Sequence, residues 1–256
     1  MSSSFPEGYG ALVQGSSRGI GLALVRRLLD DPAVGCVFAC ARDPASSAGL
    51  AELLESHPHR LVLQALDVTD QASIAAAAEI LRASELRLHL VLNVAGILHA
   101  EDGLAPEKRL EDIDLAALQR VLTVNALGPA VFIRHFLPLM ARDGKAVLAA
   151  LSARVGSIGD NRLGGWYAYR ASKAALNQVI KTSSIEAARR FRNVIVAALH
   201  PGTTDTSLSA PFQANVPDGK LFTADYVAER LLEVINGLQA QDSGGFFAWD
   251  GEAIPW

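Results

Sequence analysis

Short apolar runs alternate along the chain with longer stretches in which apolar residues recur at helical spacing. Most of the short runs are continuously apolar, a pattern that is typical of strands covered by helices on both faces of a parallel sheet. The predicted strands are residues 11–14, 35–41, 60–66, 88–94, 145–152, 193–199 and 245–249. These seven strands alternate with helices and so predict βαβ units in a doubly wound parallel sheet.

The longer stretches supply the helices of this α/β pattern. Asp70 is a suitable N-cap for the second helix, whereas Gly128-Pro129 should kink or break the third. The predicted helices are residues 20–30, 71–84, 115–140, 166–191 and 224–240. Because no linker or internal repeat interrupts the pattern, we expect residues 1–256 to form one domain.

Two irregular stretches, residues 155–165 and 200–220, directly follow predicted strands. Ligands of open α/β sheets bind beyond the carboxyl ends of the strands, so both stretches are candidate site loops. The second carries Leu208, Pro211 and Phe212. We therefore expect it to close over an apolar substrate pocket.

Composition excludes several classes of protein. Half of the 256 residues are hydrophobic, which is too many for disorder, and a net charge of −4 gives no global attraction to nucleic acid. The longest apolar runs have six residues, and the N-terminus lacks signal-peptide regions. The histidines lack metal-ligand spacing, and Cys36 and Cys40 form no CxxC pair. We expect a cytoplasmic protein that uses no metal and binds neither membrane nor nucleic acid.

A glycine-rich turn follows the first predicted strand. Gly15, Gly19 and Gly21 have the spacing GxxxGxG where the strand meets a helix. Glycine permits positive φ and a close approach of phosphate to the backbone, and the helix N-terminus attracts an anion. An ordinary tight turn is the alternative, but the strand–turn–helix context favours a nucleotide phosphate.

The end of the second predicted strand indicates which nucleotide. NAD-preferring sites usually have an acidic residue there that binds the ribose 2′-hydroxyl. Here Arg42 ends the strand and Arg18 lies in the glycine turn, and two guanidinium groups suit a 2′-phosphate. These charges favour NADP(H), while the neighbouring Asp43 leaves NAD(H) possible.

Tyr169 and Lys173 are four residues apart at the start of a predicted helix, so they share one helix face. A nearby ammonium favours the phenolate and is expected to lower the tyrosine pKa from about 10. Tyr169 can then exchange a proton with a carbonyl or alcohol oxygen. The alternative is a half-buried tyrosine beside a lysine that extends to solvent. Tyr167 has no lysine at this spacing and is the weaker candidate.

Together, the glycine turn and the Tyr169…Lys173 pair resemble the short-chain dehydrogenase/reductase family over residues 11–256. The resemblance implies a single-domain Rossmann fold that transfers hydride between a nicotinamide and a carbonyl or alcohol carbon. Further matches are Asp67-Val68, Asn93-Val94-Ala95-Gly96 and the loop Pro201-Gly202-Thr203-Thr204-Asp205-Thr206. The implied cofactor-binding residues are Gly15, Ser17, Arg18, Gly19, Ile20, Gly21, Arg42, Asp67, Val68, Asn93, Ala95, Gly96, Tyr169, Lys173, Pro201, Gly202, Thr204 and Thr206.

The resemblance also implies catalytic roles. Tyr169 is the acid or base, Lys173 binds the ribose and lowers the tyrosine pKa, and Asn125 completes a proton path through water. Considered alone, Asn125 lies on an apolar helix stripe, where a buried amide needs a partner such as a carbonyl near Gly128-Pro129.

One position departs from the family. A Ser-Ser pair usually ends the fifth strand, and its second serine polarises the substrate carbonyl; here Ala153 stands at that place. Strand alternation points Ser152 the other way. Either an irregular strand end lets Ser152 or Ser157 substitute, or Tyr169 alone holds the developing oxyanion. Loss of one such donor costs about 10²–10³ in rate. We assign Ser152 to the catalytic set with Tyr169, Lys173 and Asn125.

Residues 156–161, 164–169, 200–203 and 249–256 resemble the C-factor-type subgroup, which includes carbonyl reductases and proteins associated with cell–cell signalling. The first hypothesis is an NADP(H)-dependent oxidoreductase with a small carbonyl or alcohol substrate. The second is a nucleotide-binding signalling protein whose catalysis is weak, which Ala153 supports. The family usually packs its long helices into a homodimer or homotetramer.

Overall fold

The computed structural model describes residues 4–84 and 86–256. Seven parallel strands form its main sheet in the order β3-β2-β1-β4-β5-β6-β9, which confirms the predicted doubly wound sheet. The strands are β1 Tyr9–Gln14, β2 Val34–Ala41, β3 Leu61–Ala65, β4 Leu88–Asn93, β5 Ala146–Leu151, β6 Val194–His200 and β9 Phe246–Ala248. A second, two-residue pairing joins β7 Thr203–Thr204 to β8 Leu221–Phe222.

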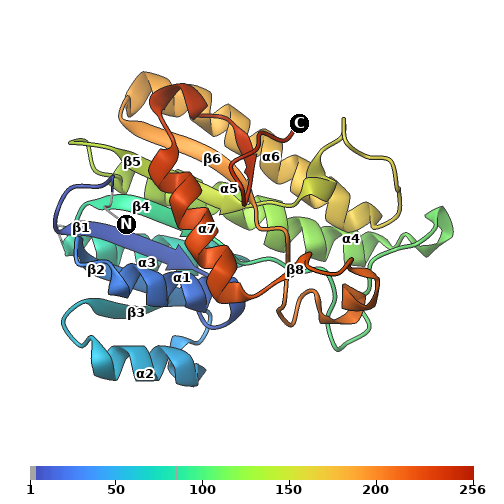
Figure 1. Ribbon diagram of the computed structural model, residues 1–256, viewed down its shortest axis with the longest axis horizontal. Helices are drawn as coiled ribbons and strands as arrows, with labels where there is room; N and C mark the ends of the chain where they lie inside the picture. The colour runs from blue at the N-terminus through green and yellow to red at the C-terminus, as the bar shows by residue number, and fades with distance from the viewer. Residues whose placement is uncertain (1–3, 85) are drawn as a thin grey trace.

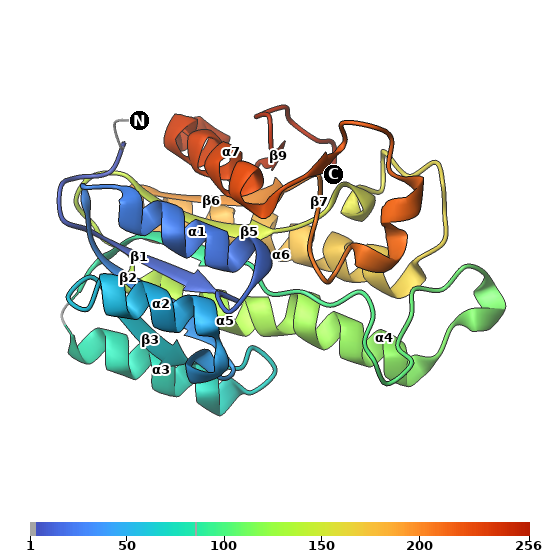
Figure 2. The same ribbon diagram turned by 60° about the horizontal axis from the view of Figure 1, so that its bottom comes forward.

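Helices cover both faces of the sheet (Figure 1, Figure 2). Helices α1, α2 and α7 pack on one face, and α3, α5 and α6 pack on the other. Adjacent residues of β4 show why its sequence is continuously apolar: Leu90 packs in the core beneath α1, α2 and α7, whereas Val91 packs in the core beneath α3, α5 and α6. The helices are α1 Gly19–Asp30, α2 Ala48–Ser56, α3 Gln71–Ala83, α4 Leu115–Leu122, α5 Gly128–Phe136, α6 Tyr167–Arg190 and α7 Ala224–Gly237.

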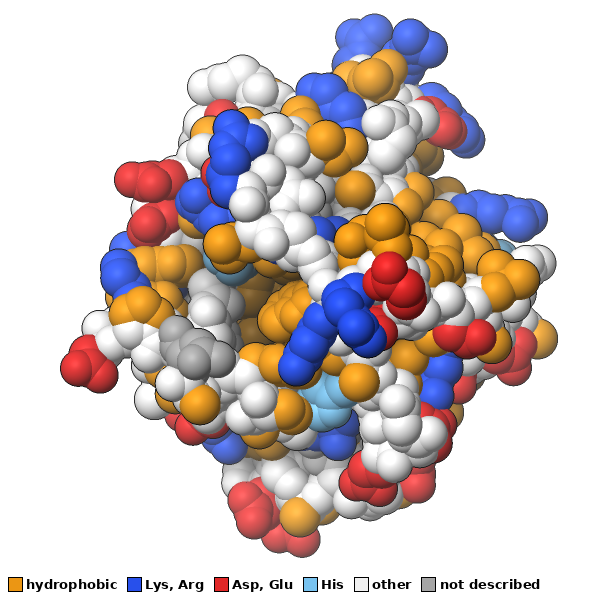
Figure 3. All heavy atoms as spheres, turned by 90° about the vertical axis from the view of Figure 1, so that its right-hand side faces the viewer, with side chains coloured by type: hydrophobic (Ala, Val, Ile, Leu, Met, Phe, Trp, Pro, Cys, Tyr) orange, Lys and Arg blue, Asp and Glu red, His pale blue; other side chains and the backbone are white. Residues whose placement is uncertain are grey.

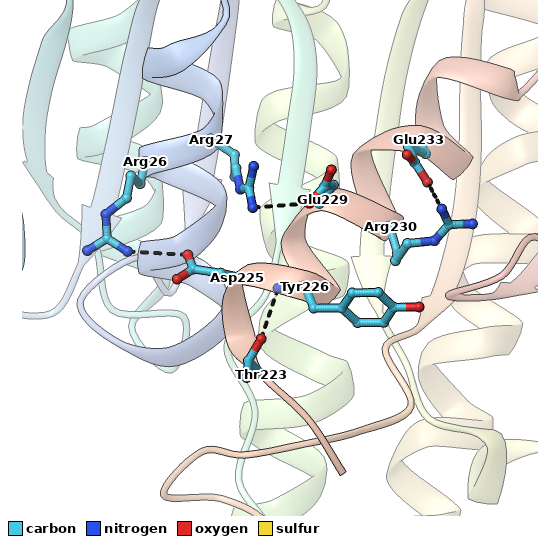
Figure 4. A network of polar contacts seen from close by, with 8 residues as sticks. All are labelled: Arg26, Arg27, Thr223, Asp225, Tyr226, Glu229, Arg230 and Glu233. Carbon is cyan, nitrogen blue, oxygen red and sulfur yellow. Dashed lines mark hydrogen bonds and ion pairs between the residues drawn. The ribbon is translucent and has the colours of Figure 1, made fainter. Parts of the chain in front are cut away.

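Two salt bridges join the neighbouring helices α1 and α7 (Figure 4). Arg26 lies 3.3 Å from Asp225, and Arg27 lies 3.1 Å from Glu229. All four side chains are partly exposed, so the pairs orient the two helices more than they stabilise the fold.

Of the predicted kink or break at Gly128-Pro129, the break is wrong. The backbone stays helical through Leu122, Leu127 and Gly128, and the irregularity is a π-helical turn, Thr123–Leu127, that comes before the proline. The Gly128 N–H bonds to the Thr123 carbonyl five residues earlier, and Pro129 has no N–H to leave unpaired, so the helix accommodates both residues.

Among the described residues, this run, Leu115–Leu139, is the one helix that is long and apolar enough to cross a membrane by length and composition alone. Its Phe132 and Phe136 are fully buried and stack with ring centres 4.3 Å apart. The α5 part of the run therefore packs in the core of the second layer.

Sequence reasoning also missed α2, β7 and β8. Helix α2 has nine residues, includes Gly49, and fully buries only Leu50, so its periodic signal is short. The paired strands β7 and β8 have two residues each, too few for any periodicity. They lie in the 200–220 loop and at its end, and give that loop its fixed course.

The order of the strands reverses between β1 and β4, which are adjacent in the sheet but not in the sequence. Such a switch point opens a crevice at the carboxyl ends of the strands. The loops that leave β1, β4, β5 and β6 all start at this edge, where the site residues are expected.

Candidate active site

The glycine turn after β1 is packed too closely for side chains at two positions. A Cβ on Gly15, whose φ is +87°, would lie 2.6 Å from the Ala95 backbone nitrogen. A Cβ on Gly21 would lie 2.0 Å from the Gly15 oxygen. The turn is tied to β2, because the N–H groups of Gly15 and Ser16 donate to the Cys40 carbonyl at 2.8 and 3.1 Å. The result is a fixed backbone cradle at the switch point.

The N-terminus of α1 opens onto this cradle. Arg18 is its N-cap and makes no capping hydrogen bond, and the first turn has no acidic residue. The free N–H groups and the dipole therefore present positive charge to a ligand. From the opposite loop, the Thr206 methyl carbon lies 3.1 Å from where a Gly19 Cβ would be. Thr206 of the 200–220 loop thus covers the turn.

The arginines predicted to bind a 2′-phosphate are both exposed and form no ion pair within residues 4–84 and 86–256. Arg42 directly follows β2, and Arg18 caps α1. The Asp43 carboxylate accepts the Ser46 N–H at 3.3 Å and caps a short 3₁₀ turn. The Asp43 carboxylate is thus bonded within its own turn, and the side chains of Arg18 and Arg42 are the ones available to bind an anionic ligand.

Residues after β3 and β4 complete the crevice. Asp67 accepts hydrogen bonds from the Thr69 N–H and hydroxyl at 2.8 and 2.7 Å, and Val68 is buried. Gln14, which sequence reasoning missed, accepts from the Asn93 side chain at 3.0 Å and from the Ala95 N–H at 3.2 Å. Its signal was a polar residue at the end of an otherwise apolar strand.

Asn125 is fully buried in the π-helical turn, at a place that positions its amide accurately. It donates to the Ile97 carbonyl at 2.8 Å and to the Ser172 hydroxyl at 3.0 Å, and its oxygen accepts the Ile97 N–H at 2.8 Å. Its partners are therefore the loop after β4 and helix α6, not a carbonyl near the Gly128-Pro129 pair. A Cβ on Gly96 would lie 3.3 Å from the Asn125 oxygen and 3.5 Å from the Lys173 Nζ, which places both groups around one point of the backbone.

Tyr169 and Lys173 are buried side by side on α6, with 9% and 3% of their surfaces exposed. The Lys173 Nζ lies 5.8 Å from the centre of the tyrosine ring and donates to the Leu151 carbonyl at 2.7 Å. The expected lowering of the tyrosine pKa is not found: burial raises the pKa of Tyr169 to about 12. Burial also lowers the pKa of Lys173 to about 8.

Neither serine near Ala153 is bonded to Tyr169. The buried Ser152 hydroxyl lies 2.6 Å from the Asn177 side-chain oxygen and donates to it. The Ser157 hydroxyl accepts the Asp160 N–H at 3.1 Å. Ala153 has extended backbone and precedes a 3₁₀ turn, so the strand has already ended there.

A cavity of about 750 Å³ opens beside the Tyr169 end of α6. Figure 3 views this edge of the molecule and shows a hollow with hydrophobic side chains inside it and basic side chains at its rim. The ring centre of Phe212, in the 200–220 loop, lies 5.0 Å from that of Trp166 and 5.8 Å from that of His99. This loop therefore lies over the cavity, as expected. The lining residues are His99, Ala100, Glu101, Gly103, Leu104, Ala105, Pro106, Lys108, Trp166, Pro211 and Phe212.

The loop after β6 begins with Pro201 and Gly202. Gly202 packs against Phe222 and Trp249, and the buried Thr204 belongs to β7. Just before it, the Nδ1 atom of His200 is buried without a hydrogen-bond partner among the described residues. Burial lowers the pKa of His200 to about 4, and Arg154 adds to the shift, so this imidazole is neutral at neutral pH.

Comparison with known proteins places these motifs in a family. A family model for short chain dehydrogenases matches residues 10–217. A 1-hydroxy-2-glutathionyl-2-methyl-3-butene dehydrogenase from Rhodococcus sp. (strain AD45) is 31% identical over 245 residues, which cover 96% of this chain and 98% of that protein. The C-signal of Myxococcus xanthus is 37% identical over 147 residues, which cover 57% of this chain and 83% of the C-signal.

The solved structures agree with this placement. The NADPH-bound carbonyl reductase from chicken fatty liver superimposes with a TM-score of 0.86 and 32% identity, covering 99% of this chain and 96% of the reductase. From the fold, the ordered motifs and these relatives, the chain belongs to the short-chain dehydrogenase family of NAD(P)-dependent oxidoreductases, which act on alcohol and carbonyl groups.

Proposed function

We propose that this protein is an NADP(H)-dependent oxidoreductase that interconverts a small carbonyl compound and its alcohol, with Tyr169 as the acid or base. The observation that carries the proposal is the buried Tyr169–Lys173 pair. The Tyr169 ring lies 6.2 Å from the ring of Trp166, which lines the 750 Å³ cavity. The Lys173 Nζ lies beside Gly96, and the neighbouring Ala95 packs against Gly15 of the glycine cradle.

The residues present fit an NADP(H) molecule. The closely packed glycine cradle and the uncapped α1 N-terminus suit a pyrophosphate, and Arg18 and Arg42 suit a 2′-phosphate. Asp67 and Val68 would lie near the adenine. Asn93, Ala95 and Gly96 would border the ribose and the nicotinamide, and Lys173 would bind the ribose. The remaining proposed contacts are Gly15, Ser17, Gly19, Ile20, Gly21, Tyr169, Pro201, Gly202, Thr204 and Thr206. The NADPH in the chicken reductase supports this choice.

The side chains of Tyr169 and Lys173 account for the proton that a carbonyl oxygen gains when it is reduced. With a pKa near 12, Tyr169 holds its proton at neutral pH and can donate it to a carbonyl oxygen. The Lys173 ammonium would stabilise the phenolate that remains. Asn125 fixes the loop after β4 and the Ser172 hydroxyl beside the pair, which keeps α6 in place. When bound, the cofactor supplies or accepts the hydride.

Ser152 takes a supporting role in this proposal. Its hydroxyl is committed to Asn177, which in turn donates to the Gly156 carbonyl at 3.4 Å. The pair would hold the end of β5 against α6, while Tyr169 supplies the main hydrogen bond to the substrate oxygen.

The second candidate function is nucleotide-dependent signalling with weak catalysis, which Ala153 and the similarity to the C-signal favour. Turnover of a panel of aldehydes, ketones and quinones with NADPH and with NADH distinguishes the two. We expect reduction of at least one class, with NADPH preferred. Tight NADPH binding without turnover anywhere in the panel would favour signalling, and a clear NADH preference would overturn the cofactor assignment.

We also propose that the chain acts as one catalytic domain that assembles into a homodimer or homotetramer. Leu115 of α4, Leu127 of the π-helical turn and Ile185 of α6 are large apolar residues that remain 69%, 57% and 49% exposed. Burial of these side chains against a second copy would remove them from water. Sedimentation velocity tests the assembly, and a monomer at micromolar concentration would contradict it.

A further inference from the structure

Trp166 has an unusual backbone conformation directly before α6. Its φ is 53° and its ψ is 45°, and it is the one non-glycine residue with positive φ among residues 4–84 and 86–256. A left-handed conformation is uncommon for a bulky side chain and persists only where surrounding contacts impose it. Such strain collects at functional sites, and specific contacts must hold Trp166 in this conformation.

Glu107 supplies two of these contacts. Its backbone carbonyl accepts the Trp166 N–H at 2.6 Å, and its carboxylate accepts the Ala168 N–H at 3.1 Å. Glu107 is only 5% exposed, whereas Pro106 and Lys108 on either side line the cavity. One residue of the loop after β4 thus holds both the residue before α6 and the first turn of that helix.

The indole held in this way stands between the proposed acid and the substrate loop. Its centre lies 6.2 Å from the Tyr169 ring, edge-on, and 5.0 Å from the Phe212 ring. Trp166 also lines the cavity. Its orientation therefore determines the shape of the cavity wall on the side nearest the Tyr169 ring.

We propose that Glu107 is a positioning residue: its carboxylate fixes the start of α6 so that Trp166 forms the cavity wall that selects bulky substrates. The structural part of this proposal stands on the contacts above, and its kinetic part rests on the proposed oxidoreductase function. Glu101 provides a matched control, because it is an exposed carboxylate of the same loop that lines the same cavity.

The structural part is tested by ¹⁹F NMR of protein that carries 5-fluorotryptophan at its three tryptophans. Trp166→Phe identifies the Trp166 resonance. We expect this resonance to shift or broaden in Glu107→Ala, to stay unchanged in Glu101→Ala, and to return in Glu107→Gln, which keeps an oxygen that accepts the Ala168 N–H. If Glu107→Ala does not fold, Glu107→Asp serves instead, since its shorter carboxylate cannot reach that N–H. An unchanged Trp166 resonance in the folded variant would overturn the proposal.

The kinetic part compares a bulky ketone, 1-acetonaphthone, with the small aldehyde propanal. For Glu107→Ala we expect kcat/KM to fall about tenfold with the ketone, mainly through KM, as expected for loss of one well-placed contact. We expect less than a threefold change with propanal and an unchanged Kd for NADPH. Equal losses with both substrates would show that Glu107 supports the fold but not the selectivity. If the wild type reduces nothing in the panel of aldehydes, ketones and quinones, the proposed function fails while the NMR result still decides the positioning role.

Discussion

The ammonium nitrogen of Lys173 lies over the face of the Tyr169 ring, 5.8 Å from its centre. Burial moves the two pKa values apart: that of Tyr169 rises to about 12 and that of Lys173 falls to about 8. The group that titrates near neutral pH is therefore the lysine. The tyrosine keeps its proton, as a donor to a carbonyl oxygen must.

Replacing Tyr169 by phenylalanine tests its role as the acid. The phenol hydroxyl is the only group removed, so we expect turnover to fall by about 10²–10⁴, the usual contribution of a positioned acid or base. NADPH binding, measured by fluorescence, should change less than twofold. Tyr167→Phe is the matched control, since Tyr167 lies on the same helix turn without a lysine four residues later. A near-normal rate for Tyr169→Phe would remove Tyr169 from the mechanism.

Stability should depend on pH through Lys173. The ordinary lysine pKa of 10.5 applies to the unfolded chain, and burial lowers the pKa of Lys173 to about 8 in the folded protein. Between these values the unfolded chain binds more protons, so wild-type stability rises with pH there, by at most about 1.4 kcal/mol per pH unit. Below pH 8 both states are protonated and this contribution is flat.

Lys173→Met removes that dependence. The free energy of unfolding of the wild type, relative to Lys173→Met, should therefore rise from pH 8 to pH 10 and stay level from pH 6 to pH 8. Urea denaturation of both proteins across this range measures the difference, in which other titrating groups cancel. A constant difference would mean that Lys173 titrates at its ordinary pKa in the folded protein.

The sheet could be predicted because burial on both faces leaves a direct trace in the sequence. The run Val194–His200 is apolar at nearly every position, since alternate residues enter the two helical layers. The family motifs likewise mark the carboxyl edge of the sheet. By contrast, the sequence of Thr123–Leu127 predicts an ordinary α-helix, because a π-helical turn depends on backbone hydrogen bonds that leave no mark in the spacing of apolar side chains.

Partners that are distant in the sequence explain what was missed at the site. Gln14 pairs with Asn93, 79 residues away, and Glu107 pairs with Ala168, 61 residues away. The identity of a polar residue does not reveal such a partner. The direction of the Tyr169 pKa shift was also wrong, because the spacing to Lys173 is visible in the sequence but the burial that outweighs it is not.

Cofactor preference should depend on the two exposed arginines. We expect Arg18→Ala and Arg42→Ala each to raise KM for NADPH about tenfold, which corresponds to the loss of one charge-assisted contact, and to change KM for NADH less than twofold. Arg26→Ala is the control, because Arg26 lies on the same helix as the Arg18 cap but pairs with Asp225. Equal losses with both cofactors would contradict a 2′-phosphate site.

We expect the serines near the end of β5 to contribute to stability more than to turnover. Ser152 already donates its proton to Asn177 at 2.6 Å, so Ser152→Ala should leave kcat within about threefold and lower stability by about 1 kcal/mol through the unpaired amide oxygen. Ser157→Ala should also leave kcat within about threefold and lower stability, since the Ser157 hydroxyl accepts the Asp160 N–H. Parallel measurements of kcat and of urea denaturation separate the two effects.

Ala153→Ser completes this test by restoring a hydroxyl at the position where the family has one. One oxyanion donor contributes about 10²–10³ in rate, so even a partly aligned hydroxyl should raise kcat about tenfold. A hundredfold loss in Ser152→Ala would instead show that substrate binding draws its hydroxyl away from Asn177. If neither serine variant loses activity and Ala153→Ser gains none, Tyr169 alone holds the oxyanion. The rate of this enzyme then does not depend on a serine hydroxyl at position 153.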